Sequence, residues 1–144
     1  MPRSKESVKQ LYDAFAKGDV ATVLGAFDPA IEWREAEGYR YSDRNPYRGP
    51  QAIAEGVFQR LVTELNDFRI AVLNMIESGD TVVVEGRYTA TVKETGTPID
   101  AQFAHVWELE NGRVTRFQQY TDTDQWNVAM QSERPDPISR AAAD

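Results

Sequence analysis

The apolar residues at the start of the chain recur every three or four positions. This spacing predicts an amphipathic helix that Ser4 caps and Gly18 ends, followed by a second helix that begins at Asp19. A third helix is predicted from Gly49-Pro50, because proline is favoured at the first helical position. Each helix is apolar on one face only, so we expect all three to cover another layer of the structure.

Alternation of apolar and polar residues then predicts strands. Residues 31–35 form a short strand, residues 36–49 follow no period and are interpreted as a loop, and four longer strands follow between residues 68 and 122. Asn111-Gly112 is the strongest hairpin signal among the turns that separate them. This order predicts an α+β domain in which three N-terminal helices pack on a strongly curved, mostly antiparallel sheet, giving a cone over an apolar pocket.

Four stretches of the chain carry a family resemblance. They are residues 8–15 followed by Gly18-Asp19, the segment 47–50, the segment 78–84, and residues 110–114 with the strand end at 119–122. In this order they resemble the SnoaL-like, ketosteroid-isomerase-like proteins of the nuclear-transport-factor-2-like superfamily. The resemblance covers residues 4–124 and implies one domain over residues 1–124 with a C-terminal tail over residues 125–144.

Composition narrows the partners and the chemistry. The length of 144 residues suits one domain, and a formal net charge of -7 disfavours nucleic acid. No apolar run is long enough for a membrane span and none resembles a signal peptide, so we expect a cytoplasmic protein. The chain has no cysteine and one histidine, and it contains no phosphate-binding or dinucleotide fingerprint. We therefore expect no metal and no cofactor.

Two residues are candidates for acid/base catalysis. His105 shares a strand face with Phe103 and Trp107, so it is either a proton carrier at the pocket wall or a hydrogen-bonded core histidine. Asp122 closes the last strand and matches the aspartate that serves as proton carrier in SnoaL-like cyclases. The resemblance implies that role for Asp122, and the alternative is a surface aspartate that caps the next turn.

Three further polar residues are candidates for orienting a substrate oxygen. Glu85 and Arg87 share one face of their strand, which is either the pocket wall or the solvent face of the sheet. Gln119 lies near the end of the last strand. Epoxide hydrolases of the superfamily use two aspartates around an arginine, and only Arg87 and Asp122 match that set here. A third aspartate is missing, which argues against epoxide hydrolysis.

Aromatic residues are expected to hold the carbon skeleton of a ligand. Those assigned to substrate binding are Trp33, Tyr41, Phe58, Phe103 and Trp107. The alternative for each is an ordinary position in the core, or an exposed position in the loop for Tyr41. Gly86 lies in mid-strand and predicts a bulge or sharp bend there.

The combined hypothesis is a cofactor-free isomerase or cyclase that moves a proton on a small hydrophobic carbonyl compound. A hydrolase or dehydratase fits less well. The alternative is a non-catalytic domain of the same fold that binds a small ligand or dimerises. A homodimer is expected in each case, because the open face of the sheet would otherwise expose a large apolar patch.

Overall fold

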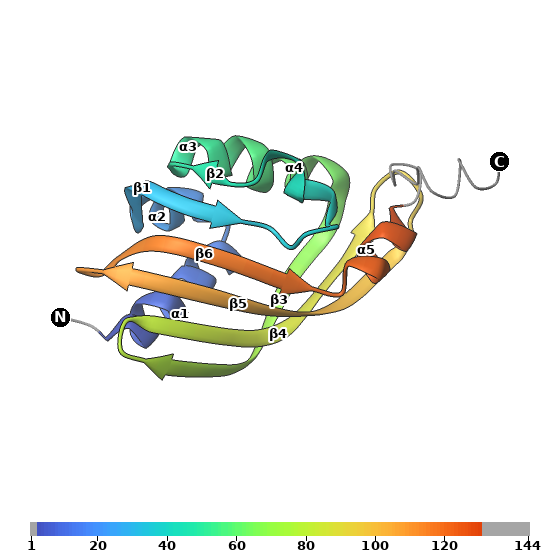
Figure 1. Ribbon diagram of the computed structural model, residues 1–144. Helices are drawn as coiled ribbons and strands as arrows, with labels where there is room; N and C mark the ends of the chain where they lie inside the picture. The colour runs from blue at the N-terminus through green and yellow to red at the C-terminus, as the bar shows by residue number, and fades with distance from the viewer. Residues whose placement is uncertain (1–2, 131–144) are drawn as a thin grey trace.

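The computed structural model describes residues 3–130 as a curved sheet with helices against it (Figure 1). The strands are β1 (Phe27–Arg34), β2 (Tyr47–Arg48), β3 (Leu65–Ser78), β4 (Thr81–Val92), β5 (Pro98–Glu110) and β6 (Arg113–Thr121). The helical segments are α1 (Ser4–Ala16), α2 (Val20–Gly25), η1 (Arg40–Arg44), α3 (Pro50–Ile53), η2 (Ala54–Phe58), α4 (Gln59–Glu64) and α5 (Thr123–Ala129). The predicted α+β class and the curved sheet are confirmed.

The strands lie in the order β2-β1-β6-β5-β4-β3. All neighbours are antiparallel except β1 and β6, which run parallel. Along β4 and β5 every second side chain is buried, and these chains form the inner wall of the sheet. The buried residues are Val82, Val84, Gly86, Tyr88, Ala90 and Val92 on β4, and Ile99, Ala101, Phe103, His105, Trp107 and Leu109 on β5.

The pairing of β3 with β4 is irregular beside Gly86. The pairing register shifts between Val72 and Asn74, so Leu73 is an extra residue in β3 opposite the segment that contains Gly86. A Cβ on Gly86 would lie 2.1 Å from the carbonyl oxygen of Ala71 and 2.7 Å from Cζ of Phe103. The predicted bulge is therefore present, but it lies in the strand beside Gly86.

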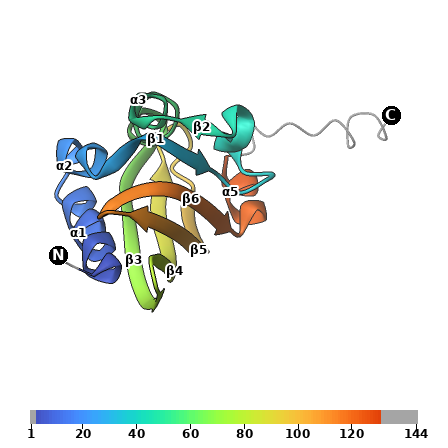
Figure 2. The ribbon, with the colours of Figure 1, turned by 60° about the vertical axis from the view of Figure 1, so that its left-hand side comes forward.

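The helices cover the inner face of this bent sheet (Figure 2). α1 packs on β3 and β4, and α3 packs on β1 and β2. α3, η2 and α4 follow one another without a break, and η2 is a π-helical turn in the middle of the segment that the sequence predicts as one helix. Among residues 3–130, no helix combines the length and apolar character that a membrane crossing needs.

The structure corrects the sequence prediction at several boundaries. α1 begins one residue earlier than predicted, because Arg3 is its N-cap and the Ser4 hydroxyl donates to Asp80 instead. The predicted loop contains η1 and the short strand β2. The predicted domain end at residue 124 falls inside α5, whose Trp126 is fully buried. Residues 131–144 of the predicted tail lie outside the described part of the chain.

Replacing Gly86 by alanine should lower the free energy of unfolding by roughly 2 kcal/mol or more, because the added methyl group meets backbone and a packed ring. Gly25→Ala is the matched control, since a Cβ there has no neighbour within 4 Å. Urea titrations of both variants measure the difference. Equal stability of the two variants would contradict the close approach at Gly86.

Candidate active site

The cone encloses a cavity between the helices and the inner face of the sheet. It holds about 570 Å³ of atom-free space, measured out to its open mouth. Aromatic and aliphatic side chains make up most of the wall, as is usual for small-molecule sites. The lining residues are Leu11, Tyr12, Phe15, Val23, Phe27, Trp33, Glu35, Tyr39, Val57, Phe58, Leu61, Phe68, Ile70, Tyr88, His105, Trp107, Phe117 and Gln119.

Among the described residues 3–130, Glu35 is the only carboxylic acid that lines this cavity. It follows the last residue of β1, where the alternation that buries Ile31 and Trp33 turns the next side chain inward. Glu35 is 2 % exposed, and its Oε2 accepts a 3.0 Å hydrogen bond from Nε1 of Trp33. Within residues 3–130, Oε1 has no hydrogen-bond partner and is not among the fully enclosed atoms. We conclude that Oε1 faces the cavity.

Burial raises the pKa of Glu35 to about 8, because an ionised carboxylate loses its hydration in this apolar wall. The hydrogen bond from Trp33 and the charge of Arg60 oppose the shift. No lysine or arginine lines the cavity in the described structure, so no adjacent cation neutralises the carboxylate. Near neutral pH, Glu35 can therefore exchange a proton in either direction.

His105 is held between two tyrosines. Nδ1 lies 2.5 Å from the Tyr12 hydroxyl on α1, and Nε2 makes a short hydrogen bond to the Tyr88 hydroxyl on β4. Trp107 Nε1 donates to the Tyr12 oxygen over 2.9 Å, and Gln119 Nε2 donates to the Tyr88 oxygen over 2.9 Å. Both imidazole nitrogens are thus occupied by protein groups.

Burial also sets the protonation of this group. It lowers the pKa of His105 to about 3 and raises the pKa of Tyr12 and of Tyr88 above the ordinary tyrosine value. The charge of Glu35 adds to the rise at Tyr88 and at Tyr39, so the carboxyl lies within electrostatic reach of both hydroxyls. Near neutral pH the imidazole and the phenols are all uncharged.

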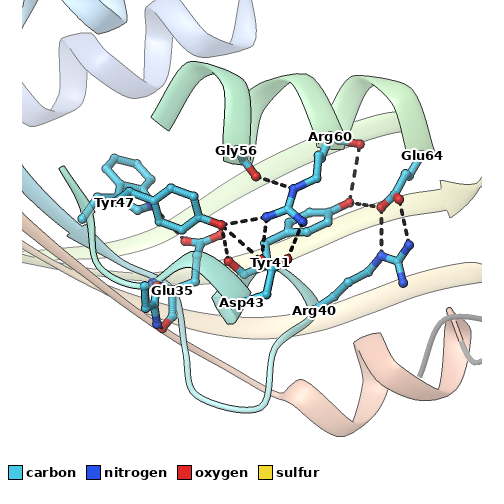
Figure 3. Close-up of polar contacts among 10 residues, drawn as sticks. Glu35, Arg40, Tyr41, Asp43, Tyr47, Gly56, Arg60 and Glu64 are labelled. Atoms are coloured by element: carbon cyan, nitrogen blue, oxygen red, sulfur yellow. Dashed lines mark hydrogen bonds and ion pairs between the residues drawn. The ribbon is translucent and has the colours of Figure 1, made fainter. Parts of the chain in front are cut away.

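Arg60 on α4 fixes the segment that follows Glu35 (Figure 3). Its Nε donates to the Gly56 carbonyl in the π-helical turn over 2.5 Å, and its terminal nitrogens donate to Asp43 over 2.8 and 3.0 Å. It also donates to the Tyr47 hydroxyl over 2.7 Å and lies 4.6 Å from the centre of the Tyr41 ring. One guanidinium group therefore joins η1, β2 and η2.

Two further contacts hold the same segment. Glu64 accepts bonds of 2.9 and 2.7 Å from Arg40 and a short bond from the Tyr41 hydroxyl. The Asn45 side chain pairs with both the backbone N–H and the carbonyl of Glu35, over 2.9 and 2.8 Å. These contacts leave the Glu35 backbone little freedom, so its carboxyl is held in a defined position.

Five of the residues predicted for the site line the cavity together. They are His105, Trp33, Phe58, Trp107 and Gln119. Alternation predicted that His105 and Trp107 share one face of β5, and in the structure that face is buried. The alternative for His105, a buried core histidine held by hydrogen bonds, also fits the structure, because both of its ring nitrogens have partners.

Three predicted residues lie outside the cavity. Asp122 caps α5 by accepting from the Gln125 backbone N–H, so the alternative of a capping aspartate is correct. Glu85 and Arg87 alternate with the buried residues of β4 and therefore point to the outer face. There Glu85 bonds Asn74 and Arg87 pairs with Asp100 over 2.8 Å. The placement of these three residues in the pocket is corrected.

Two predicted aromatic residues are buried without lining the cavity. Tyr41 is turned towards α4 by η1, where its ring lies under Arg60. Phe103 stacks on the imidazole of His105, with ring centres 4.0 Å apart, and supports it from behind. Both residues therefore pack against side chains around the cavity, and neither is placed to contact a ligand.

Sequence reasoning missed Glu35 and Tyr88. The signal for Glu35 was present, because alternation from Ile31 and Trp33 puts a charged residue at an inward position. The same argument applies to Tyr88, which shares the inward phase of Val84 on β4. In the described residues, no three potential metal ligands cluster, so these side chains offer no ready metal site.

Several solved structures have a fold similar to that of this chain. An NTF2-like protein from Burkholderia thailandensis is 34% identical over 91% of this chain and 99% of its own, with a TM-score of 0.86. TerC, co-crystallised with polyporic acid, is 29% identical over 89% of this chain and 98% of its own, with a TM-score of 0.80. IdmH, a putative polyketide cyclase from Streptomyces antibioticus, shares the fold at 20% identity. The match covers 92% of this chain and 98% of IdmH, with a TM-score of 0.72.

The family comparison covers most of the domain. No curated protein matches the chain. The family model of the SnoaL-like domain matches residues 8–117, a range that runs from the buried Val8 of α1 to Phe117 on the cavity wall. This chain belongs to the SnoaL-like family.

Proposed function

We propose that this protein is an enzyme that transfers a proton on a small hydrophobic carbonyl compound, with Glu35 as the proton carrier. The observation that carries the proposal is a single buried carboxyl group, with its pKa raised to about 8, facing an aromatic cavity in the described part of the chain. A carboxyl group in such surroundings is tuned for acid/base work near neutral pH.

The first step uses the ionised form of Glu35. Oε1 removes a proton from a carbon next to the carbonyl group, and the electron pair of the broken C–H bond moves to the carbonyl oxygen as an enolate forms. A phenol hydroxyl in the wall donates a hydrogen bond to that oxygen and so lowers the barrier. The walls exclude bulk water, which strengthens this hydrogen bond.

The second step returns the proton. Glu35 is now a neutral carboxylic acid, which is stable in the apolar wall. Where the substrate carries a C=C bond next to the deprotonated carbon, the enolate is a dienolate, and Glu35 protonates its γ-carbon while the double bond moves into conjugation with the carbonyl group. The result is an isomerisation with no net change in atoms or charge. If the enolate carbon instead attacks a second carbonyl group of the same molecule, a C–C bond forms and Glu35 protonates the new alkoxide oxygen, which is a cyclisation.

This proposal changes the roles expected from the sequence. His105 is a poor general base at neutral pH, because its pKa is lowered to about 3 and both nitrogens are engaged. Asp122 caps a helix outside the cavity. Support for a small-molecule ligand comes from TerC, a relative of the same fold co-crystallised with polyporic acid, and from the putative cyclase IdmH.

We also propose that the protein forms a homodimer through the outer face of the sheet. Ile76 and Tyr120 on that face are 51 % and 57 % exposed, and Leu73 at the bulge is 69 % exposed. Sedimentation of the full chain should give twice the monomer mass at micromolar concentration. A monomer at high micromolar concentration would contradict this proposal.

Glu35→Gln should abolish proton abstraction but keep ligand binding, since the amide preserves shape and cannot accept the proton. We expect the wild type to exchange the α-protons of 2-tetralone, a flat bicyclic ketone, with D2O at least ~100-fold faster than the variant. Proton NMR follows the exchange. The wild-type rate should rise as the pH approaches about 8 and then level off, because the carboxylate is the reactive form.

Glu37→Gln is the matched control, since Glu37 is exposed and close in sequence. It should exchange 2-tetralone at the wild-type rate. If Glu35→Gln exchanges the ketone as fast as the wild type, Glu35 is not the proton carrier. A protein that binds 2-tetralone but leaves exchange at the buffer rate is a ligand-binding member of the family.

The pH dependence of stability tests the ionisation of Glu35 independently of turnover. In the unfolded chain Glu35 ionises near its usual pKa of 4.5, and in the folded chain near 8. The unfolded state therefore loses its proton first, and Glu35 lowers the free energy of unfolding by about 1.4 kcal/mol per pH unit between these values. Urea titrations should show wild type losing stability relative to Glu35→Gln from pH 5 to 8; a constant difference would contradict the raised pKa.

A further inference from the structure

The hydrogen bonds around His105 have directions that the donors themselves determine. The indole Nε1 of Trp107 can only donate, so the Tyr12 oxygen accepts from it. The backbone N–H of Ala36 donates to Gln119 Oε1 over 3.1 Å, which fixes the amide with its NH2 group towards Tyr88. The Tyr88 oxygen therefore accepts from Gln119, and each tyrosine oxygen already has one fixed donor.

A neutral imidazole then uses only one of the two phenol protons. If Nδ1 carries the proton, it donates to Tyr12, and Tyr88 donates its own proton to Nε2. If Nε2 carries the proton, it donates to Tyr88, and Tyr12 donates to Nδ1. In the first tautomer the Tyr12 proton has no acceptor among residues 3–130, and in the second the Tyr88 proton has none.

Both tyrosines line the cavity, so the proton that the network does not use is available to a ligand. We propose that Tyr12 and Tyr88 form a two-position hydrogen-bond donor for the carbonyl oxygen of an uncharged aromatic ketone, and that His105 is a neutral spacer whose tautomer decides which tyrosine donates. This deepens the proposed function, since it rests on the same cavity and names its ligand class. It does not depend on proton transfer by Glu35.

The charge of the wall supports an uncharged ligand. No lysine or arginine of the described chain lines the cavity, and His105 is neutral, so an anionic group would enter without a counter-ion. The rings of Trp33 and Phe117, which stack on each other, and of Trp107, which meets Phe117 edge-to-face, instead offer apolar aromatic surface. Gln119 and Trp107 act as positioning residues, because they turn the tyrosine oxygens into acceptors and leave the protons for the ligand.

The single histidine makes the tautomer measurable. In 15N-labelled wild-type protein at pH 7, saturated with 2-acetylnaphthalene, long-range 1H–15N spectra should show His105 neutral, with one protonated and one unprotonated ring nitrogen. The protonated nitrogen identifies the donor: Nδ1–H leaves the Tyr12 proton for the ketone, and Nε2–H leaves the Tyr88 proton. An imidazolium at pH 7 would overturn the proposal.

Binding of matched probes gives a second identification of the donor. Wild type should bind 2-acetylnaphthalene three- to tenfold more tightly than 2-isopropenylnaphthalene, which has a CH2 group in place of the oxygen, because one hydrogen bond contributes roughly 0.5–1.5 kcal/mol net. 2-Naphthoate should bind more weakly than either. The phenylalanine variant of the tyrosine named by NMR should lose the ketone preference.

The controls separate donation from folding. Tyr120→Phe removes the same hydroxyl from the outer face and should keep the wild-type preference. If Tyr12→Phe or Tyr88→Phe fails to fold, the infrared C=O stretch of the ketone bound to the wild type still tests whether a phenol donates to it. Such a hydrogen bond shifts the stretch to lower frequency. An unshifted band, no preference for the ketone, or loss of preference in the wrong variant would overturn the proposal.

The outcomes also separate this proposal from the proposed enzyme. If the wild-type protein catalyses no α-proton exchange in any ketone, but His105 is neutral and the C=O band is shifted, the donor pair is retained and catalysis by Glu35 is rejected. Exchange that depends on Glu35, together with an unshifted C=O band, would retain the proton carrier and reject the donor pair.

Discussion

The close packing of β3, β4 and β5 at Gly86 is the constraint on which the cavity wall depends. The extra residue Leu73 and the missing side chain at Gly86 let β3 and β4 turn, and the ring of Phe103 fills the space that a Cβ would need. The position of the imidazole follows from this packing, because Phe103 stacks on His105.

Enclosure then sets the electrostatics of every ionisable group in the wall. The same loss of hydration favours a neutral Glu35, a neutral His105 and neutral tyrosines. The three cases differ in consequence, because only the carboxyl group has its pKa moved towards neutral pH. The imidazole and the phenols are moved away from it, so they serve as fixed dipoles while Glu35 can change charge.

Much of the fold could be predicted from the chain, and less of the site. Alternation along β4 and β5, the Asn111-Gly112 turn and the helical spacing of the first residues are local signals, and they predicted the α+β class and the curved, mostly antiparallel sheet correctly, although not the short strand β2. Alternation also placed His105 and Trp107 on one face of their strand, and the structure identifies it as the inner face. Asp122 was misplaced because its role was carried over from a family motif, while its own backbone begins a helix that the sequence pattern did not reveal.

The hydrogen bonds of the site join parts of the chain that are far apart in sequence. Tyr12 and His105 are separated by 93 residues, and Tyr12 and Trp107 by 95. Closing loops of this length costs conformational entropy, so these hydrogen bonds require α1 to be docked on the sheet. A truncated chain that lacks α1 would therefore leave His105 and Trp107 without Tyr12, their shared partner, even where its sheet is kept.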